Sequence, residues 1–229
     1  RPCRISRGLE HGYCHHHRWT RERVEAAVEA RGGPQGFDLR EAQLSGLDLS
    51  GINLQEAILR GANLQKANLR DAQLERAQLQ ASDLQGAYLT GANLHSADLQ
   101  QAILEEATAS GANLQKARLP LANLRRVHLH DADLRWAYLT SADMKCATLY
   151  CSDLRGADLS HADLREARLS TNLPGMTLGA NLEYACLEYA DLRGADLEAA
   201  NLQGANLRYA DLRGVDLSRL SDRGLERVR

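Results

Sequence analysis

The residues best suited to chemistry lie near the N-terminus, in the stretch RPCRISRGLEHGYCHHHRW. Cys3, Cys14 and His17 have the order C-x10-C-x2-H, and His11 or His15 offers a further ring nitrogen. Zinc takes four sulfur or nitrogen ligands in a tetrahedron, and C-x2-H spacing lets two of them share one turn. The pattern therefore predicts a zinc site formed by Cys3, His11, Cys14 and His17. The alternative is a His-rich terminus with incidental thiols.

His128 and His130 are the other residues whose type suits catalysis. No nucleophile–base pair and no glycine-rich phosphate loop accompanies them in the sequence. Cys146 and Cys151 are expected to be free thiols. Because catalysis usually needs a concave, partly dry pocket, these residues do not indicate an enzyme.

A five-residue period organises most of the chain. From Phe37 the sequence reads FDLRE, AQLSG, LDLSG, INLQE, AILRG, with a small residue, a polar residue, a central Leu and two further polar or small residues. Central positions recur every fifth residue from Leu39 to Leu169, which gives 27 repeats, and again from Leu182 to Leu217, which gives eight. With Leu173 and Leu178 as plausible centres between them, the total is 37.

This period excludes a helix, because five residues turn an α-helix through about 500° and would spread the leucines over every side. In a short strand, residues two apart point the same way. Ala62 and Leu64 are therefore expected to face inward together, with Asn63 outward. The two remaining residues turn the chain before the next strand. A stack of parallel coils then pairs each backbone with the coils above and below it.

The repeats resemble the pentapeptide-repeat family, whose motif is A(D/N)LXX, over about four-fifths of the chain. The resemblance implies an all-β fold, a right-handed quadrilateral parallel β-helix with four repeats per coil. Thirty-seven repeats would make about nine coils and, at ~4.8 Å per coil, a rod roughly 45 Å long.

Four segments follow from these patterns. Residues 1–19 form the Cys/His-rich segment, and residues 20–33 form a capping helix with Thr20 as N-cap and Gly32-Gly33 as its stop. Residues 34–219 form the β-helix, and residues 220–229 form a C-terminal cap with a second short helix over Ser221–Val228. Phe37, Leu47 and Ile52 replace the usual Ala of the first coil and are expected to plug the tube.

The period breaks at residues 170–181, in STNLPGMTLGAN. Leu169 and Leu182 lie 13 residues apart, where the period gives 10 or 15. Two interpretations are open, namely two one-residue deletions or a three-residue loop bulging from one corner.

Exposed aromatic side chains and Arg are typical of protein interfaces, and they supply the candidate partner-binding residues. Four repeats per coil put His128, Thr148 and Arg168 in one column, with His130 and Tyr150 on the same side and Trp136 and Tyr138 on adjoining sides. Tyr184, Tyr189 and Tyr209 form a second cluster, with the last two stacked; corner packing is the preferred explanation for this cluster. The full candidate set is His128, His130, Trp136, Tyr138, Tyr150, Arg168, Tyr184, Tyr189 and Tyr209.

Charge and cysteine usage bound the function. The formal net charge is −2, so the chain as a whole has no drive toward nucleic acid or membrane, and no apolar run is long enough to span a bilayer. The cysteine count of five is odd, and three of the cysteines lie in the repeats at unrelated positions, which favours a reduced, cytoplasmic compartment.

The leading interpretation is a non-enzymatic scaffold that presents rigid faces to a protein partner. The sequence does not identify the partner or the oligomeric state, and a homo-oligomer is one of the options.

The first alternative is DNA mimicry. Some members of the family mimic duplex DNA and protect a type II topoisomerase (gyrase) from poisons. Residues 34–219 hold 18 basic and 24 acidic residues, a net charge of −6 with Arg interleaved among the acids. A mimic needs uninterrupted negative stripes.

The second alternative is nucleic-acid binding by the N-terminal segment, with the rod as a spacer. The tight part GYCHHH followed by RW resembles the end of a Cys-Cys-Cys-His zinc knuckle; in such knuckles a further Cys precedes the one matching Cys3, and here it would lie before Arg1. Residues 1–33 carry seven Arg and four Glu, a net charge of +3 that could contact phosphates.

Two assays on residues 1–33 test this alternative. We expect bound zinc in a metal assay and DNA binding that weakens as salt rises, because phosphate contacts release counterions. If the segment takes up neither zinc nor nucleic acid, the hypothesis is wrong.

Overall fold

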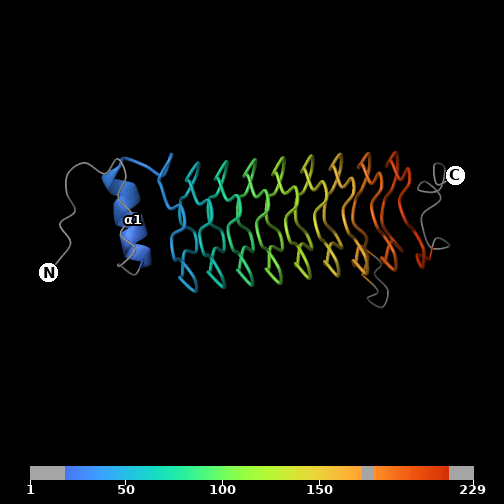
Figure 1. The fold of residues 1–229 in the computed structure, drawn as a ribbon, viewed down its shortest axis with the longest axis horizontal. Coiled ribbons are helices and arrows are strands. Elements are labelled where there is room, and N and C mark those ends of the chain that lie inside the picture. Colours follow the sequence, from blue (N-terminus) through green and yellow to red (C-terminus); the bar gives the residue numbers. More distant parts are fainter. Residues whose placement is uncertain (1–18, 172–177, 217–229) are drawn as a thin grey trace.

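The protein is described by a computed structural model over residues 19–171 and 178–216. A helix, α1 (Arg21–Ala30), lies at one end of a long rod made of stacked coils (Figure 1). The strands of the rod are single parallel bridges between residues 20 apart, such as Asn63 with Asp83. Four repeats therefore complete one coil. The rod is a right-handed quadrilateral β-helix, as the sequence predicted.

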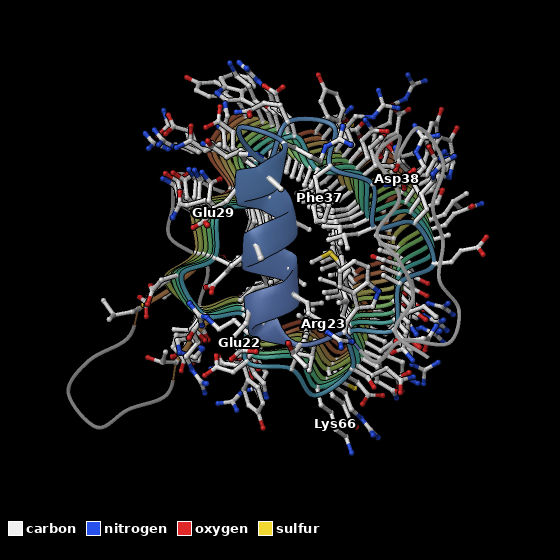
Figure 2. The ribbon with its side chains drawn as sticks, turned by 90° about the vertical axis from the view of Figure 1, so that its left-hand side faces the viewer. Glu22, Arg23, Glu29, Phe37, Asp38 and Lys66 are labelled. Carbon is white, nitrogen blue, oxygen red and sulfur yellow. The ribbon has the colours of Figure 1, made fainter. Side chains whose placement is uncertain are left out.

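Capping hydrogen bonds define both ends of α1. The Oγ1 atom of Thr20 accepts a hydrogen bond from the Arg23 N–H at 3.4 Å, and Gly33 N–H donates to the Val28 carbonyl at 3.1 Å. The helix lies across the open end of the tube (Figure 2). Val24 is fully buried there, Phe37 and Ile52 are buried in the first coil, and Leu47 is only half-buried. Apolar side chains thus close this end against water.

Each coil holds its neighbours through the backbone. Leu64 N–H donates to the Asp83 carbonyl at 2.7 Å, and Asn63 N–H donates to the Ala42 carbonyl of the preceding coil at 2.9 Å. The same pair of bonds recurs along the rod, so backbone groups that face the apolar interior are satisfied. The side chains of Ala62 and Leu64 are buried and that of Asn63 is partly exposed, as the alternation predicted.

The second residue after each central Leu makes the corner. It has a positive φ at every described corner except Thr171 and Ala199, and this angle lies between 53° and 61° at the 22 corners that are not glycine. This left-handed conformation costs roughly 1–2 kcal/mol for a residue with a Cβ. The outward Asn or Asp before the Leu supports the turn, as where Asn63 Oδ1 accepts from the Gln65 N–H at 3.2 Å. Corner side chains consequently project from the edges of the rod.

The irregular segment differs from both sequence interpretations. Asp153 pairs with Asn181, 28 positions on instead of 20, so Leu182 is the centre that follows Leu169 and eight residues are inserted between them. Leu178 is therefore not a repeat centre, and Leu173 lies outside the described residues. The residues that the structure describes hold 34 repeat centres, 27 from Leu39 to Leu169 and seven from Leu182 to Leu212.

The insertion leaves and re-enters the coil at one corner. Ser170 and Gly179 form an antiparallel bridge, and the Ala180 N–H donates to the Leu169 carbonyl at 2.7 Å, as the corner bond does elsewhere. The coil is thus closed beneath the insertion. The C-terminal cap expected over residues 220–229, with its helix Ser221–Val228, lies outside the described residues.

Acidic and basic side chains form ladders on the outside of the rod. Arg193 Nη2 lies 2.7 Å from Asp191 Oδ2 of its own repeat, and Arg193 Nε lies 3.6 Å from Asp211 Oδ2 of the next coil. The Arg193 hydrogen bonds hold the pKa of Asp191 below its usual range, and those of Arg213 lower the pKa of Asp211 to about 2. These carboxylates are therefore ionised and paired at neutral pH.

We expect Leu84→Ala to lower the free energy of unfolding by about 2–5 kcal/mol, because Leu84 is fully buried and its truncation leaves a cavity. Leu121→Ala, at a corner site that is 55% exposed, should change it by less than about 0.5 kcal/mol. Urea denaturation of both variants measures the difference. Equal losses would show that the leucines do not line the interior.

Gly179→Ala should also destabilise the rod, because a Cβ there would lie 2.0 Å from the Ala199 backbone oxygen in the next coil. Since the backbone itself must move, we expect a loss of about 3 kcal/mol. Gly111→Ala is the control, as its Cβ would meet nothing within 4 Å and costs only the strain of its φ of 65°, roughly 1 kcal/mol. Thermal or urea unfolding ranks the two variants. The reverse order would contradict the position of the insertion.

Acid should weaken the rod in a defined window. An Asp whose pKa is lower in the folded than in the unfolded state stabilises the fold at any pH above its unfolded pKa, about 3.9. This stabilisation is lost as the pH falls from there to the pKa of the folded state. We therefore expect the urea midpoint to stay level at mildly acidic pH and to fall between about pH 4 and 2. Asp191→Asn should reduce the size of this fall. An unchanged dependence of the urea midpoint on pH in the variant would show that the ionisation of Asp191 does not contribute to the stability of the fold.

Candidate partner-binding surface

The four sides of the rod are named by their first central leucine: face 1 carries Leu39, face 2 Leu44, face 3 Leu49 and face 4 Leu54. Faces 1 and 3 are opposite, because four repeats complete a coil. Side chains project outward from all four sides when the rod is viewed along its axis (Figure 2). The faces differ only in these side chains, so any binding specificity lies in them.

Exposed aromatic residues gather on and around face 1. Tyr138 stands on the face itself and is 53% exposed. Trp136 and Tyr184 lie on the corner between faces 4 and 1, and Tyr189 and Tyr209 lie on the corner between faces 1 and 2. All five side chains are at least half exposed. We call this set the aromatic surface. Tyr184 lies two coils beyond Trp136, and Tyr209 three coils beyond Tyr138, so the set extends roughly 14 Å along the rod.

Glycines determine how two of these rings lie. A Cβ added at Gly156 would fall 2.3 Å from a ring atom of Trp136, and a Cβ at Gly204 would fall 2.5 Å from the Tyr184 ring. Each ring therefore extends along the corner over the glycine of the next coil. Because glycine has no Cβ, one side of the ring can lie against the backbone. The other side of the ring stays exposed to solvent.

The opposite edge of face 1 carries a ladder of stacked rings. The Tyr189 ring stacks on His161 at 4.9 Å and on Tyr209 at 4.8 Å between centroids. The spacing equals that of neighbouring coils, so the fold itself sets the stack. Stacking of Tyr189 on Tyr209 was predicted from the sequence. Corner packing was the preferred explanation, but Tyr189 is 50% exposed and Tyr209 59% exposed, so these rings present surface.

Polar side chains lie between the two aromatic edges. Asp158 Oδ2 accepts from the Thr140 hydroxyl at 3.0 Å, and Asp158 Oδ1 accepts from the Ser160 hydroxyl at 2.6 Å. Burial raises the pKa of Asp158, but the Ser160 and Thr140 hydrogen bonds more than offset it, so the pKa lies below the usual range. Face 1 therefore presents a fixed negative charge between exposed rings.

Face 3 holds the other sequence candidates. His128, Thr148 and Arg168 form one column, as predicted, and the His130 and Tyr150 rings stack at 5.0 Å. The sequence placed Tyr138 on a side adjoining this column; four repeats per coil put it on face 1, directly opposite. The nine candidates therefore divide into two surfaces on opposite sides of the rod.

Four residues next to the aromatic surface were not among the partner-binding candidates from the sequence, namely His161, Leu121, Gly156 and Gly204. His161 precedes Tyr189 by 28 residues instead of 20, so only a correct reading of the insertion brings the two together. The glycines could have been found from the alternation of aromatic and glycine residues along one corner.

The described residues show little that suits nucleophilic catalysis. Burial and the neighbouring Glu166 raise the pKa of the Cys146 thiol, and burial and Asp131 raise that of Cys151. Both thiols are therefore protonated at neutral pH and are weak nucleophiles. Within residues 19–171 and 178–216, no three His, Cys, Asp or Glu side chains are placed to hold a metal. The zinc candidates Cys3, His11, Cys14 and His17 lie outside the described residues.

Among the described residues, no helix has the length and apolar character needed to cross a membrane.

Comparison with known proteins agrees with the repeat geometry. The family model for pentapeptide repeats matches residues 38–74, 72–108, 110–145, 132–170 and 180–219. A search of curated proteins found no match. Among solved structures, HetL, a pentapeptide repeat protein involved in heterocyst differentiation regulation from the cyanobacterium Nostoc sp. Strain PCC 7120, is 32% identical over 86% of this chain and 94% of its own, with a TM-score of 0.42.

Full-length QnrB1, a plasmid-mediated fluoroquinolone resistance protein, is 16% identical over 82% of this chain and 88% of its own, with a TM-score of 0.44. A pentapeptide repeat protein from the Arabidopsis thaliana thylakoid lumen is 28% identical over 58% of this chain and 71% of its own, with a TM-score of 0.24. The family model, which matches most of the chain, establishes together with the coil geometry that the chain belongs to the pentapeptide-repeat family.

Proposed function

We propose that the chain is a non-enzymatic scaffold and that the aromatic surface on face 1 binds a protein partner. One observation carries this proposal. The chain has ten aromatic residues of the types Phe, Trp and Tyr, and five of them stand exposed on and around one face. Aromatic side chains supply much of the binding energy at protein interfaces, because they bury large areas with few rotatable bonds.

The rod also favours binding through its rigidity. The glycine of the next coil fixes the Trp136 and Tyr184 rings, and stacking fixes those of Tyr189 and Tyr209. A partner that docks on these rings therefore orders few side chains, so little of the contact energy is lost to conformational entropy.

Protection of a topoisomerase by DNA mimicry is the second candidate, favoured by the net charge of −6 over residues 34–219. The ion-pair ladders argue against it, because Arg135, Arg165 and Arg193 each contact the Asp of their own repeat and that of the next coil. A negative charge that is paired in this way does not present the continuous field of a duplex. A nucleic-acid-binding zinc segment at residues 1–19 is the third candidate, and it rests on the sequence alone.

Affinity capture from an extract of the native cell tests the scaffold proposal. We expect the triple variant Trp136→Ala, Tyr184→Ala, Tyr189→Ala to lose the captured partner, with affinity reduced by about a hundredfold or more, since interface aromatics each contribute about 2 kcal/mol or more. Tyr88→Ala is the control, because Tyr88 is 41% exposed but lies on face 3.

Capture that survives in the triple variant, or is lost equally in the control, would contradict a partner site on face 1. The capture could instead recover a topoisomerase that binds through the acidic residues and not through the aromatic rings. That result would favour DNA mimicry over the scaffold proposal.

A further inference from the structure

Face 3 carries a cluster of polar groups that the scaffold function does not use. His128, Thr148 and Arg168 occupy the outward position of three successive coils. His128 and Arg168 are exposed, whereas Thr148 between them is only 9% exposed. Two long side chains that can carry positive charge thus flank a hydroxyl, on the side of the rod opposite the aromatic surface.

Arg168 differs from the other arginines of the described rod in having no side-chain partner. Every other arginine of the described repeats forms an ion pair, a hydrogen bond or a contact with an aromatic ring. Asp196 occupies the same column in the next coil, but its Oδ1 atom accepts from the Glu198 N–H at 3.2 Å and it forms no ion pair with Arg168. Five guanidinium donors are therefore available at this place.

A second unsatisfied group lies in the same repeat. Ser170 follows Arg168 by two positions and is fully buried, and its Oγ atom is the one buried side-chain oxygen or nitrogen without a hydrogen-bond partner among the described residues. Buried polar groups are almost always hydrogen-bonded, so such an exception calls for an explanation. The free guanidinium and the unpaired hydroxyl thus lie in one repeat of face 3, but the Ser170 hydroxyl is fully buried and only the guanidinium belongs to the exposed column.

We propose that Arg168, His128 and Thr148 form a binding site for a tetrahedral oxyanion of the phosphate monoester class. A guanidinium donates two parallel hydrogen bonds to such a group, and charge assistance makes these bonds strong. His128 and Arg168 stand two coils apart, about 9.6 Å at the backbone, so their side chains approach one anion from opposite sides across Thr148. A carboxylate has only two oxygens for these three donors, whereas a phosphate monoester has three that are free.

Neighbouring charges set the strength of the site. Asp196 and Glu198 lie in the next coil of face 3, Asp131 lies on the corner after His130, and Glu166 precedes Arg168 by two residues. The Glu166 Oε2 atom accepts from the Cys146 thiol at 3.5 Å. These carboxylates weaken anion binding, Asp196 the most because it is the next residue in the column. Removal of the Asp196 charge should therefore strengthen binding.

Titration of the full chain with inorganic phosphate at neutral pH and constant ionic strength tests the site. The probes are the Arg168 Nε–H and His128 ring resonances in NMR spectra. We expect saturable shifts that Arg168→Gln weakens by about tenfold or more, the value of one lost charge-assisted bond. Asp196→Asn should tighten binding. Arg60→Gln is the matched control, because Arg60 is exposed on face 1 and already bonds Gln80 at 3.1 Å.

A phosphoserine peptide in a parallel titration distinguishes the two sources of the anion. Tighter binding of the peptide than of phosphate assigns the site to a phosphorylated protein, and equal binding assigns it to a free phosphate compound. Shifts that do not saturate, equal losses in Arg168→Gln and Arg60→Gln, or weaker binding in Asp196→Asn would overturn the proposal. Circular dichroism of each variant shows whether the fold is intact.

Discussion

Backbone pairing between residues 20 apart is the constraint on which the rest of the structure depends. Each central residue donates its N–H to the carbonyl of the coil that follows, and the outward residue before it donates to the coil that precedes. Outside the eight-residue insertion, this register requires coils of equal length, which fixes four repeats of five residues per coil, and the corner residues are left-handed at all described corners except Thr171 and Ala199. The interior is then too narrow for anything but Leu, Ala and their near equivalents. Met144 and Ala109 occupy central positions and are as buried as the leucines around them.

Because the interior and the backbone maintain the fold, the outside is free to vary. Corner and face residues can carry aromatic rings, ion pairs or unpaired cations without disturbing the coil, and this chain places each kind in a different region. Rings surround face 1, Asp–Arg ladders run along faces 2 and 4, and the free Arg168 stands on face 3. The sides of one rod can therefore serve separate partners. Rigidity makes these positions exact enough for recognition, since each side chain is placed by the coils on both sides of it.

The period of five predicted parallel coils with Ala and Leu inside, whereas the right-handed, four-sided coil was implied by the resemblance to the pentapeptide-repeat family. Ala62 and Leu64 had to face inward, and Thr20 with Gly33 had to bound the N-terminal helix. The insertion was misread because Leu178 satisfies the repeat motif by residue type, and only the pairing of Asp153 with Asn181 shows that it is not a repeat centre. Because of that error, the stacking of His161 on Tyr189 was not predicted. The candidate residues themselves were found by type and exposure, but their division between two opposite faces required the register of the coil.

Binding through rigid faces requires that the rod is preorganised throughout, including the coils that carry the aromatic rings. Hydrogen exchange of the free chain, measured at single amides, tests this most directly. The central N–H groups from Leu64 to Leu164 should all exchange only through global unfolding, with the amides of Leu134, Leu139 and Leu159 as slow as that of Leu64. Fast exchange confined to the coils around Trp136 and Tyr138 would show that the aromatic surface is assembled on binding, and would contradict a preorganised rod.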